Sequence, residues 1–354
     1  MKVVVKMKDV TIRRSDLAIE VVEQFIGEAS GKHTGVVKEE YKDGELKVTC
    51  IDILKGYEKK TGKAPGRYVS IDTSKLGLDT ADKLEQTRLV FSNELQKFLA
   101  YKGIEADSTC LVVGLGNEHI TPDALGPMVL DNIIVTRHLY EMAADALDGD
   151  YRKVSAFAPG VMGLTGIETF DIIESVVKKT KPDFLIVVDA LAARAVSRVN
   201  KMIQMTDTGI SPGSGVGNKR RPIDEASLGV PVIAIGIPTV VDAASVTHDT
   251  IDLLLKHIGV SLASQKGQDN DLAHAKGSDV ELALPDEKVR KEFLGKVGML
   301  SEGEKRQLLD EVLTPTGYNL IVTPKTIDSE MEDLSRLVSN AVNVALHPHI
   351  AFSA

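Results

Sequence analysis

The run Phe184–Val188 is apolar at every position, and this feature constrains the fold more than any other in the chain. A strand with one solvated face alternates apolar and polar side chains, whereas a continuously apolar strand is buried on both faces. Similar short runs occupy Thr109–Val113 and Val230–Ile235, and helical patterns over Gly166–Lys178 and Ser245–His257 alternate with the runs. The alternation predicts an α/β fold of the phosphorylase or hydrolase type, with a mostly parallel, twisted sheet and helices on both faces.

The chain before this region has a different pattern. Lys47–Leu54 and Arg67–Ile71 alternate or carry β-branched residues, and Lys42-Asp-Gly44 fits a hairpin turn. These signals predict an N-terminal β-rich addition to the α/β core. The predicted parts are, in order, the addition, the core, a polar insertion and C-terminal elements, over 17–78, 79–260, 261–300 and 301–354.

The charge and cysteine content narrow the class of partner. Lys and Arg number 42 and Asp and Glu number 51, which gives a net charge of −9. An acidic surface repels a phosphate backbone, so no direct nucleic-acid partner is expected. Two cysteines fit a reducing compartment. No targeting segment is evident and no apolar run approaches the roughly 18 residues of a membrane helix. The sequence therefore predicts a soluble, cytoplasmic protein without a membrane partner.

Three near-matches to ligand-binding motifs fail on spacing or residue type. Gly56–Ala64 resembles a phosphate-binding loop, but it has one residue too many between its glycines, and Ala64 stands after Lys63 where a hydroxyl is required. Gly114-Leu-Gly116 follows a strand but lacks the third glycine of a dinucleotide site. His347-Pro-His349 is typical of a solvated tail rather than a zinc site. No metal and no cofactor are predicted.

Two carboxylates follow neighbouring buried strands. Asp123 comes shortly after the run that ends at Val113, where an aspartate is also a common helix N-cap. Asp189 directly follows Phe184–Val188, and a charge there is costly unless it is paired or functional. Because parallel strands end at the same edge of a sheet, the two acids are expected to share a site. Repulsion then raises one pKa and leaves one acid and one base, which suits attack of water on an amide.

The segment Thr208–Arg221 is a glycine-rich loop with a basic end, and it lies between two of the predicted strands. Such a loop can present N–H groups and positive charge to an acidic ligand, or it can be an exposed, mobile loop. A further strand end carries Asp242, which we expect to shape the same cleft. The substrate-binding residues predicted from these two segments are Gly213, Gly215, Lys219, Arg220 and Asp242, with Arg221 beside them.

Taken together, five strings in this order resemble the germination protease family of spore-forming bacteria. The resemblance covers the chain from about Arg14 to the C-terminus and is strongest between 110 and 260. The strings are Thr121-Pro-Asp-Ala-Leu-Gly-Pro127, Ala158-Pro-Gly-Val-Met-Gly-Leu-Thr-Gly166, Asp189-Ala-Leu-Ala-Ala-Arg194, Ser211-Pro-Gly-Ser-Gly-Val-Gly-Asn-Lys219 and Gly236-Ile-Pro-Thr-Val-Val-Asp-Ala243.

The resemblance implies an activity and a set of partners. The family degrades the small acid-soluble proteins that coat spore DNA, and it consists of atypical aspartic endopeptidases with a fold like that of the hydrogenase maturation proteases. Its catalytic acids match Asp123 and Asp189, each within its full motif. The resemblance also implies a homotetramer in the spore core.

The family is made as a zymogen, and the matching string is Arg14-Ser-Asp-Leu-Ala-Ile-Glu20. This implies cleavage between Asp16 and Leu17, so that residues 1–16 form a propeptide and 17–354 form a single protease domain. The acidic residues that flank the bond are expected to contact the basic end of the glycine-rich loop. The preceding residues, Met1–Ile12, share little with the family pattern.

Other classes of function remain open at this point. A metal-dependent maturation-type protease would use the same acids as ligands with His248 or His119, and it would be sensitive to a chelator. A nucleoside phosphorylase-like enzyme would hold phosphate in the glycine-rich loop and depend on phosphate for turnover. A non-enzymatic binding protein would tolerate replacement of both acids.

Overall fold

The computed structural model describes residues 15–26, 35–75, 77–142, 151–212, 220–265, 284–313 and 320–347. The chain forms two compact units. The larger, called here the sheet unit, comprises Arg14–Ala193, Ser197–Val240 and Thr323–Ala354. The smaller, the helical unit, includes Arg194–Val196 and Val241–Val322. The finer division of the chain made from the sequence stays a prediction.

One sheet runs in the order β1-β2-β3-β7-β8-β6-β4-β5, and β9 pairs with the end of β8. The strands are β1 (Val36–Asp43), β2 (Leu46–Ile53), β3 (Gly66–Asp72), β4 (Cys110–Gly114), β5 (Val154–Phe157), β6 (Phe184–Ala193), β7 (Met202–Thr206), β8 (Val232–Asp242) and β9 (Ile321–Val322). The α/β class is confirmed, and the N-terminal β-rich addition joins this sheet through β3, which pairs with β7.

The sheet is mixed in strand direction. β4 is parallel to β5 and to β6. From β1 to β8, by contrast, the successive pairings through β2, β3 and β7 are antiparallel. For β1 and β2 the reason lies in their connection, a tight hairpin at Gly44, where a parallel crossover cannot fit. Parallel pairing is thus found for β4, β5 and β6, whereas the third apolar run, in β8, pairs antiparallel with β7.

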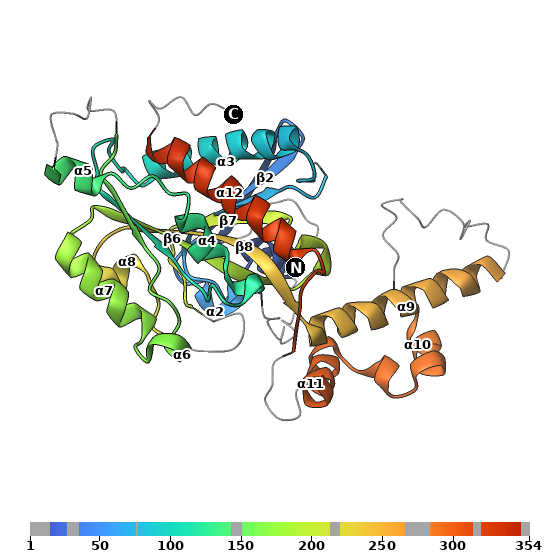
Figure 1. Ribbon diagram of the computed structural model, residues 1–354. Helices are drawn as coiled ribbons and strands as arrows, with labels where there is room; N and C mark the ends of the chain where they lie inside the picture. The colour runs from blue at the N-terminus through green and yellow to red at the C-terminus, as the bar shows by residue number, and fades with distance from the viewer. Residues whose placement is uncertain are drawn as a thin grey trace, which may run out of the picture. The chain divides into compact units, whose positions relative to one another are not determined.

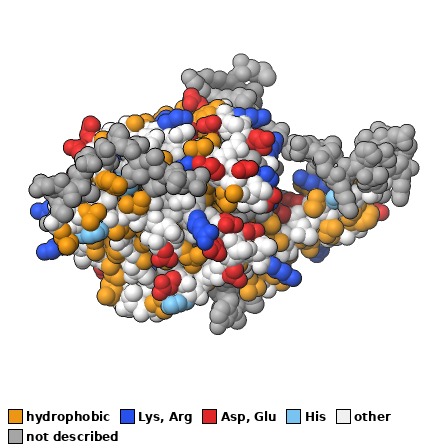
Figure 2. All heavy atoms as spheres, turned by 45° about the horizontal axis from the view of Figure 1, so that its top comes forward, with side chains coloured by type: hydrophobic (Ala, Val, Ile, Leu, Met, Phe, Trp, Pro, Cys, Tyr) orange, Lys and Arg blue, Asp and Glu red, His pale blue; other side chains and the backbone are white. Residues whose placement is uncertain are grey.

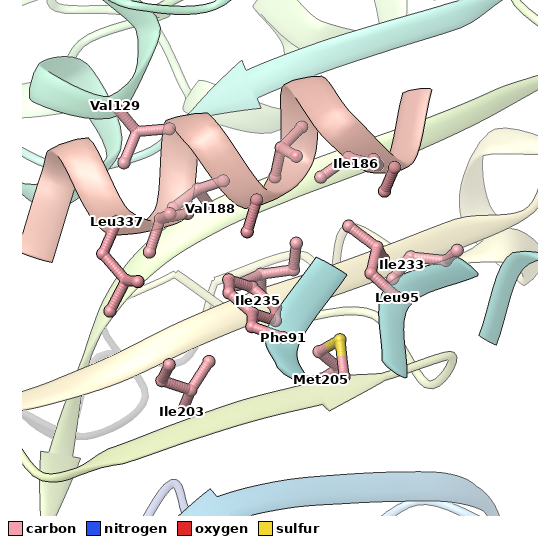
Figure 3. Close-up of a cluster of buried hydrophobic side chains, with 14 of the residues drawn as sticks. Phe91, Leu95, Val129, Ile186, Val188, Ile203, Met205, Ile233, Ile235 and Leu337 are labelled. Atoms are coloured by element: carbon pink, nitrogen blue, oxygen red, sulfur yellow. The ribbon is translucent and has the colours of Figure 1, made fainter. Parts of the chain in front are cut away.

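Helices cover both faces of the sheet unit, which explains the continuously apolar strands (Figure 1). One face carries α3 (Ala81–Tyr101), α4 (Leu125–Leu130) and α12 (Ile327–Leu346), and the other carries α7 (Thr169–Thr180). Alternate side chains of β6 pack on opposite faces of the sheet. Ile186 belongs to the hydrophobic cluster under α3 and α12, and Val187 belongs to the hydrophobic cluster under α7. Figure 3 shows the first cluster, with side chains of α3 and α12 over those of β6, β7 and β8.

Shorter helices complete the sheet unit. They are α1 (Ala18–Ile26), α2 (Glu58–Thr61), α5 (Arg137–Met142), α6 (Met162–Thr165), α8 (Glu225–Leu228) and the 3-10 turn η1 (Thr121–Asp123); another 3-10 turn, η3, spans Val196–Arg198. None of the helices in the described ranges is long and apolar enough to cross a membrane. On the face shown in Figure 2, acidic and basic side chains are interspersed rather than gathered by sign.

The helical unit contains α9 (Ala243–Gln265), α10 (Glu287–Leu294), the 3-10 turn η6 (Val297–Met299) and α11 (Glu302–Leu313). Charged contacts join α9 to α11, because the Lys305 ammonium lies 3.1 Å from the Asp252 carboxylate. Of the polar stretch predicted to be an exposed loop, 264–278, residues 266–278 lie outside the described ranges.

His347 corrects one sequence interpretation. It is fully buried, its Nδ1 accepts the Arg152 N–H at 3.2 Å, and its ring lies 5.7 Å from that of Tyr151. Burial lowers its pKa. The prediction of a solvated tail is therefore wrong for His347, since α12 runs into the core and carries the residue with it. His349 lies outside the described part of the chain.

The side chain of Asn343 on α12 forms hydrogen bonds with the loop after α4. Replacement of Asn343 is expected to destabilise the sheet unit. Its amide donates to the Asn132 carbonyl at 2.8 Å and accepts the Ile134 N–H at 2.9 Å. Asn343→Ala removes the partners of the Asn132 carbonyl and of the Ile134 N–H, which are both only partly shielded from solvent, at a cost of about 1–2 kcal/mol of unfolding free energy. Urea unfolding measures the loss. The exposed Asn340→Ala on the same helix is the control and should change the value by less than about 0.5 kcal/mol.

Candidate active site

Close backbone contacts fix the turn that carries Asp123. Leu115 donates its N–H to the Val188 carbonyl at 2.8 Å, which joins the end of β4 to β6. Gly116 has a φ of +116°, and a Cβ there would lie 1.9 Å from the Asp123 carbonyl oxygen. Gly126 is as closely packed, since its Cβ would lie 2.2 Å from the Leu115 carbonyl oxygen. Only glycine fits at these positions, so they hold Asp123 against the end of β4.

The Asp123 side chain faces back toward β4 rather than capping the next helix. Its Oδ2 accepts the Asn117 N–H at 2.9 Å, and the N-cap of α4 is Ala124. Thr239 of β8 supports the same turn by donating its hydroxyl to the Pro122 carbonyl at 2.5 Å. Burial raises the pKa of Asp123, while the Asn117 N–H and the charge of Arg220 act to lower it.

Asp189 lies one residue beyond the point where β6 pairs with the end of β4. Its side chain is 7% exposed, and its Oδ1 accepts the Ala190 N–H at 2.9 Å. Burial, followed by the negative charges of Asp123 and Asp16, raises the pKa of Asp189 well above its usual range. The two acids selected from the sequence are therefore electrostatic neighbours, and the Asp189 carboxyl favours its protonated form.

The peptide segment around Asp16 is bound to the same strand. Asp16 donates its N–H to the Ala192 carbonyl at 3.0 Å, and its Oδ2 accepts the Ala192 N–H at 2.9 Å. This pairing lies three residues beyond Asp189 on β6. The residue before the predicted cleavage site is thus held on β6 near Asp189 by both its backbone and its carboxylate.

The Asp16 carbonyl oxygen accepts two hydrogen bonds. Lys63 donates from Nζ at 2.9 Å and Gln204 of β7 donates from Nε2 at 3.1 Å. The same ammonium also binds the Ser15 carbonyl at 2.9 Å. On the other side of the Asp16–Leu17 bond, Ala18 donates its N–H to the Gln204 Oε1 at 2.7 Å. Gln204 therefore binds the chain on both sides of the bond.

The residues that follow the bond are buried in the sheet unit. Leu17 is 0% exposed. Glu20 is also buried and accepts a hydrogen bond from Ser15 Oγ. A guanidinium nitrogen of Arg198 lies 3.8 Å from the Glu20 carboxylate. Glu20, four residues after Asp16, is thus paired with the cationic side chain of Arg198.

The structure describes only part of the predicted substrate-binding set. Gly213, Gly215 and Lys219 lie outside the described residues. Arg220 lies close enough to lower the pKa of Asp123. Its neighbour Arg221 instead pairs with Asp171 at 3.2 Å.

Asp242 lies in the helical unit, where its carboxylate accepts the Ser245 N–H at 2.8 Å at the start of α9. The Arg306 guanidinium donates to the same carboxylate at 2.9 Å. The substrate-binding roles of these residues stay predictions.

The two histidines of the metal-dependent alternative belong to different units. His119 is exposed and lies 3.7 Å from Glu118, and His248 belongs to the helical unit. Among the residues that the structure describes, no three His, Cys, Asp or Glu side chains are grouped as metal ligands.

Sequence reasoning missed Lys63, Gln204 and Arg198. Gln204 carried a usable signal, since it is an amide within the apolar strand Met202–Thr206 and is 5% exposed. A buried amide requires partners, so its presence in such a strand indicates a specific role. Lys63 was noticed only as part of a failed phosphate-binding motif, and its distance along the chain from Asp16 hides the contact.

The germination protease family model matches residues 11–353. The chain belongs to the germination protease family. The germination protease of Bacillus subtilis (strain 168) is 46% identical over 347 residues, which cover 96% of this chain and 94% of that protein. The germination protease of Bacillus velezensis is 48% identical over the same shares of the two chains.

Among solved structures, the [NiFe] hydrogenase maturation protease HycI from Thermococcus kodakarensis KOD1 is similar at 15% identity. That match has a TM-score of 0.24 and covers 57% of this chain and 93% of the other. A score of this size is too low for a comparison of the two sites.

Membership of the germination protease family confirms the resemblance seen in the sequence. The chain is a peptidase of spore germination. This sets aside the phosphorylase-like and non-enzymatic alternatives.

Proposed function

We propose that this germination protease is an aspartic endopeptidase that uses Asp123 and Asp189 as its acid–base pair. We also propose that it is made as a zymogen and cuts its own Asp16–Leu17 bond. The observation that carries both parts is the position of Asp16, which pairs with β6 beyond Asp189 and whose charge raises the Asp189 pKa. The pairing of Asp16 with the strand that carries Asp189 supports a bound substrate segment as well as a cover for the site.

The different surroundings of the two acids assign their roles. Asp189 is the more strongly shifted group, so it holds the proton that the pair shares, and Asp123 is the ionised partner. Asp123 accepts a proton from the attacking water, while protonated Asp189 acts as the acid at the peptide bond. Such a pair needs one proton between two carboxyls, and burial of Asp189 together with the negative charge of Asp123 favours retention of that proton on Asp189.

The substrates that we propose are small acid-soluble spore proteins, cut in the spore core. The bound segment Asp16-Leu-Ala-Ile-Glu20 supplies the pattern, since an acid precedes the bond and a second acid follows it. Arg198 supports selection of that second acid, because it lies beside the Glu20 carboxylate. We further propose that the enzyme assembles as a homotetramer and needs no metal or other cofactor.

Mass spectrometry of the full chain tests this function. The purified protein is incubated until its mass no longer changes, and a small acid-soluble spore protein is then added, with and without a chelator. We expect a product that begins at Leu17, followed by cuts in the spore protein at similar acid–apolar–Ala sequences in both conditions. A mature chain that begins elsewhere contradicts the zymogen assignment. Cleavage that the chelator stops indicates the metal-dependent alternative, and an intact spore protein rejects the proposed substrate.

A further inference from the structure

The proposed self-cleavage leaves one charged residue beside the bond unexplained. We propose that Lys63, with Gln204 beside it, binds the carbonyl oxygen of the bond to be cut and stabilises the negative charge that develops there. This inference rests on the proposed function, because it takes Asp16–Leu17 as the reacting bond. It makes Lys63 a catalytic residue and gives the enzyme an oxyanion site separate from the acid pair.

The orientation of the Gln204 amide is fixed by its neighbours. The Ala18 N–H is a donor only, so the amide atom that faces it at 2.7 Å must be the oxygen. The amide nitrogen is then the atom at 3.1 Å from the Asp16 carbonyl oxygen, where it donates. With Lys63 Nζ at 2.9 Å, both donors lie at distances typical of oxyanion-site hydrogen bonds.

The other contacts of Lys63 leave its charge available to this oxygen. Both of its hydrogen bonds go to carbonyl oxygens, those of Ser15 and Asp16, and among the described residues it forms no ion pair with a carboxylate. Lys63 is partly exposed as a residue, but its ammonium is buried, and this desolvation lowers its pKa while the charges of Asp16 and Glu20 act to raise it. A cation held only by neutral oxygens gains most when one of them becomes negative.

The reaction step then has a place for each atom. The oxygen of water bonds to the Asp16 carbonyl carbon, and one proton of the water passes to the Asp123 carboxylate. The carbonyl oxygen becomes an oxyanion held by Lys63 and Gln204. The bond from carbon to the Leu17 nitrogen breaks as that nitrogen takes a proton from Asp189, which leaves a carboxylic acid on Asp16 and an amine on Leu17. The new acid then gives its proton to Asp189 and Asp123 gives its proton to the amine, so that the products are a carboxylate and an ammonium and both aspartates return to their starting states.

This assignment divides the chemistry between two groups of residues. The carbonyl oxygen already accepts two hydrogen bonds, so protonated Asp189 is not required to polarise it. Asp189 is then left to supply the proton that the leaving nitrogen needs. Lys63 and Gln204 act on the oxygen, and Asp123 and Asp189 move the protons.

The test is the first-order rate of Asp16–Leu17 cleavage in the full chain, followed by mass spectrometry after a pH jump. Lys63→Met is expected to lower this rate by about 100-fold or more, and Gln204→Met by a smaller factor. Lys63→Arg should recover part of the rate, because a guanidinium is also a cation that donates hydrogen bonds. The control is Lys59→Met, the same substitution at an exposed lysine of α2, which should be cut at the wild-type rate.

A second measurement separates catalysis from mere anchoring of the propeptide. Hydrogen exchange at the Leu17 and Ala18 amides is compared in Asp189→Asn and in Asp189→Asn/Lys63→Met, both of which stay uncleaved. We expect similar protection in the two proteins. If Lys63→Met lowered the protection of these amides by as large a factor as it lowers the cleavage rate, Lys63 would only anchor the propeptide. That result would overturn the inference.

The outcomes also distinguish this inference from the proposed function. A wild-type chain that stays intact, or an Asp189→Asn chain that is cut at full rate, overturns the proposed function and the role of Lys63 with it. A cleaved wild type, an inactive Asp189→Asn and a Lys63→Met chain cut within threefold of the wild-type rate overturn the role of Lys63 alone.

Discussion

Replacing Asp189 with asparagine is expected to lower the rate of cleavage at Asp16–Leu17 by about 10²- to 10⁴-fold while the chain stays folded. Asparagine keeps the size of the side chain, and its oxygen can still accept the Ala190 N–H, but it cannot give a proton to the leaving nitrogen. The rate is measured by mass spectrometry on the full chain. The same substitution at exposed Asp82 of α3 is the control and should leave the rate unchanged. Near-normal cleavage by Asp189→Asn would remove the acid pair from consideration.

The stability of this variant should also depend less on pH than that of Asp123→Asn, which is likewise expected to stay uncleaved. Asp189 has a folded-state pKa well above its unfolded value of about 3.9, because burial and the charges of its neighbours disfavour ionisation. The stability contributed by a group with a raised pKa is complete below the unfolded pKa and is lost as pH rises through the folded pKa.

The melting temperature of Asp123→Asn should fall as pH rises from 4 to 8, because this variant retains the buried Asp189. The melting temperature of Asp189→Asn should fall less over the same range. Melting curves recorded across this range for the two variants provide the measurement. Equal slopes would contradict a buried, protonated Asp189.

Gly116→Ala is expected to damage both stability and activity. A Cβ would lie 1.9 Å from the Asp123 carbonyl oxygen, and the φ of +116° is one that side chains with a Cβ rarely adopt. Overlap and backbone strain each cost about 1–3 kcal/mol, so we expect a loss of about 2–4 kcal/mol in unfolding free energy. The same shift of the turn moves Asp123 and should slow cleavage by about 100-fold. Urea unfolding and the cleavage assay measure the two effects.

Gly163→Ala on α6 is the matched control. A Cβ at Gly163 meets no atom within 4 Å, so neither stability nor rate should fall. If Gly116→Ala behaved like Gly163→Ala, the close contact between the Gly116 backbone and the Asp123 turn would not be what positions the acid.

The sequence was most informative where burial leaves a local mark. The run Phe184–Val188 is apolar because helices cover both faces, and Asp189 is conspicuous because it follows directly. The direction of β7 has no such mark, since a short apolar strand has the same composition in either direction. His347 was misjudged because a position near the chain end says nothing about the helix that carries it into the core.

The proximity of Asp123 and Asp189 was predictable from the sequence, whereas the contacts of Lys63 and Gln204 were not. Asp123 and Asp189 follow strands whose parallel pairing brings them to one edge, so sequence order and fold class were enough to join them. Lys63 and Gln204 reach the Asp16 carbonyl from α2's C-terminal loop and from β7, two places that only the folded chain brings together. Roles that depend on such long-range contacts require coordinates.

The burial of Leu17 bears on how the propeptide would leave the site after cleavage. Its backbone nitrogen is now an uncharged amide that donates to Ser15 Oγ at 3.0 Å, and its side chain is 0% exposed. Hydrolysis at Asp16–Leu17 would convert that amide into a terminal amine, which takes up a proton at neutral pH, and would free the Ser15 side of the chain to depart. That charge stays on the mature chain, whereas the departing segment keeps the Asp16 N–H and carboxylate that bind Ala192 of β6. Cutting the bond would therefore not by itself empty the site, and release of the propeptide would also require this strand pairing to break.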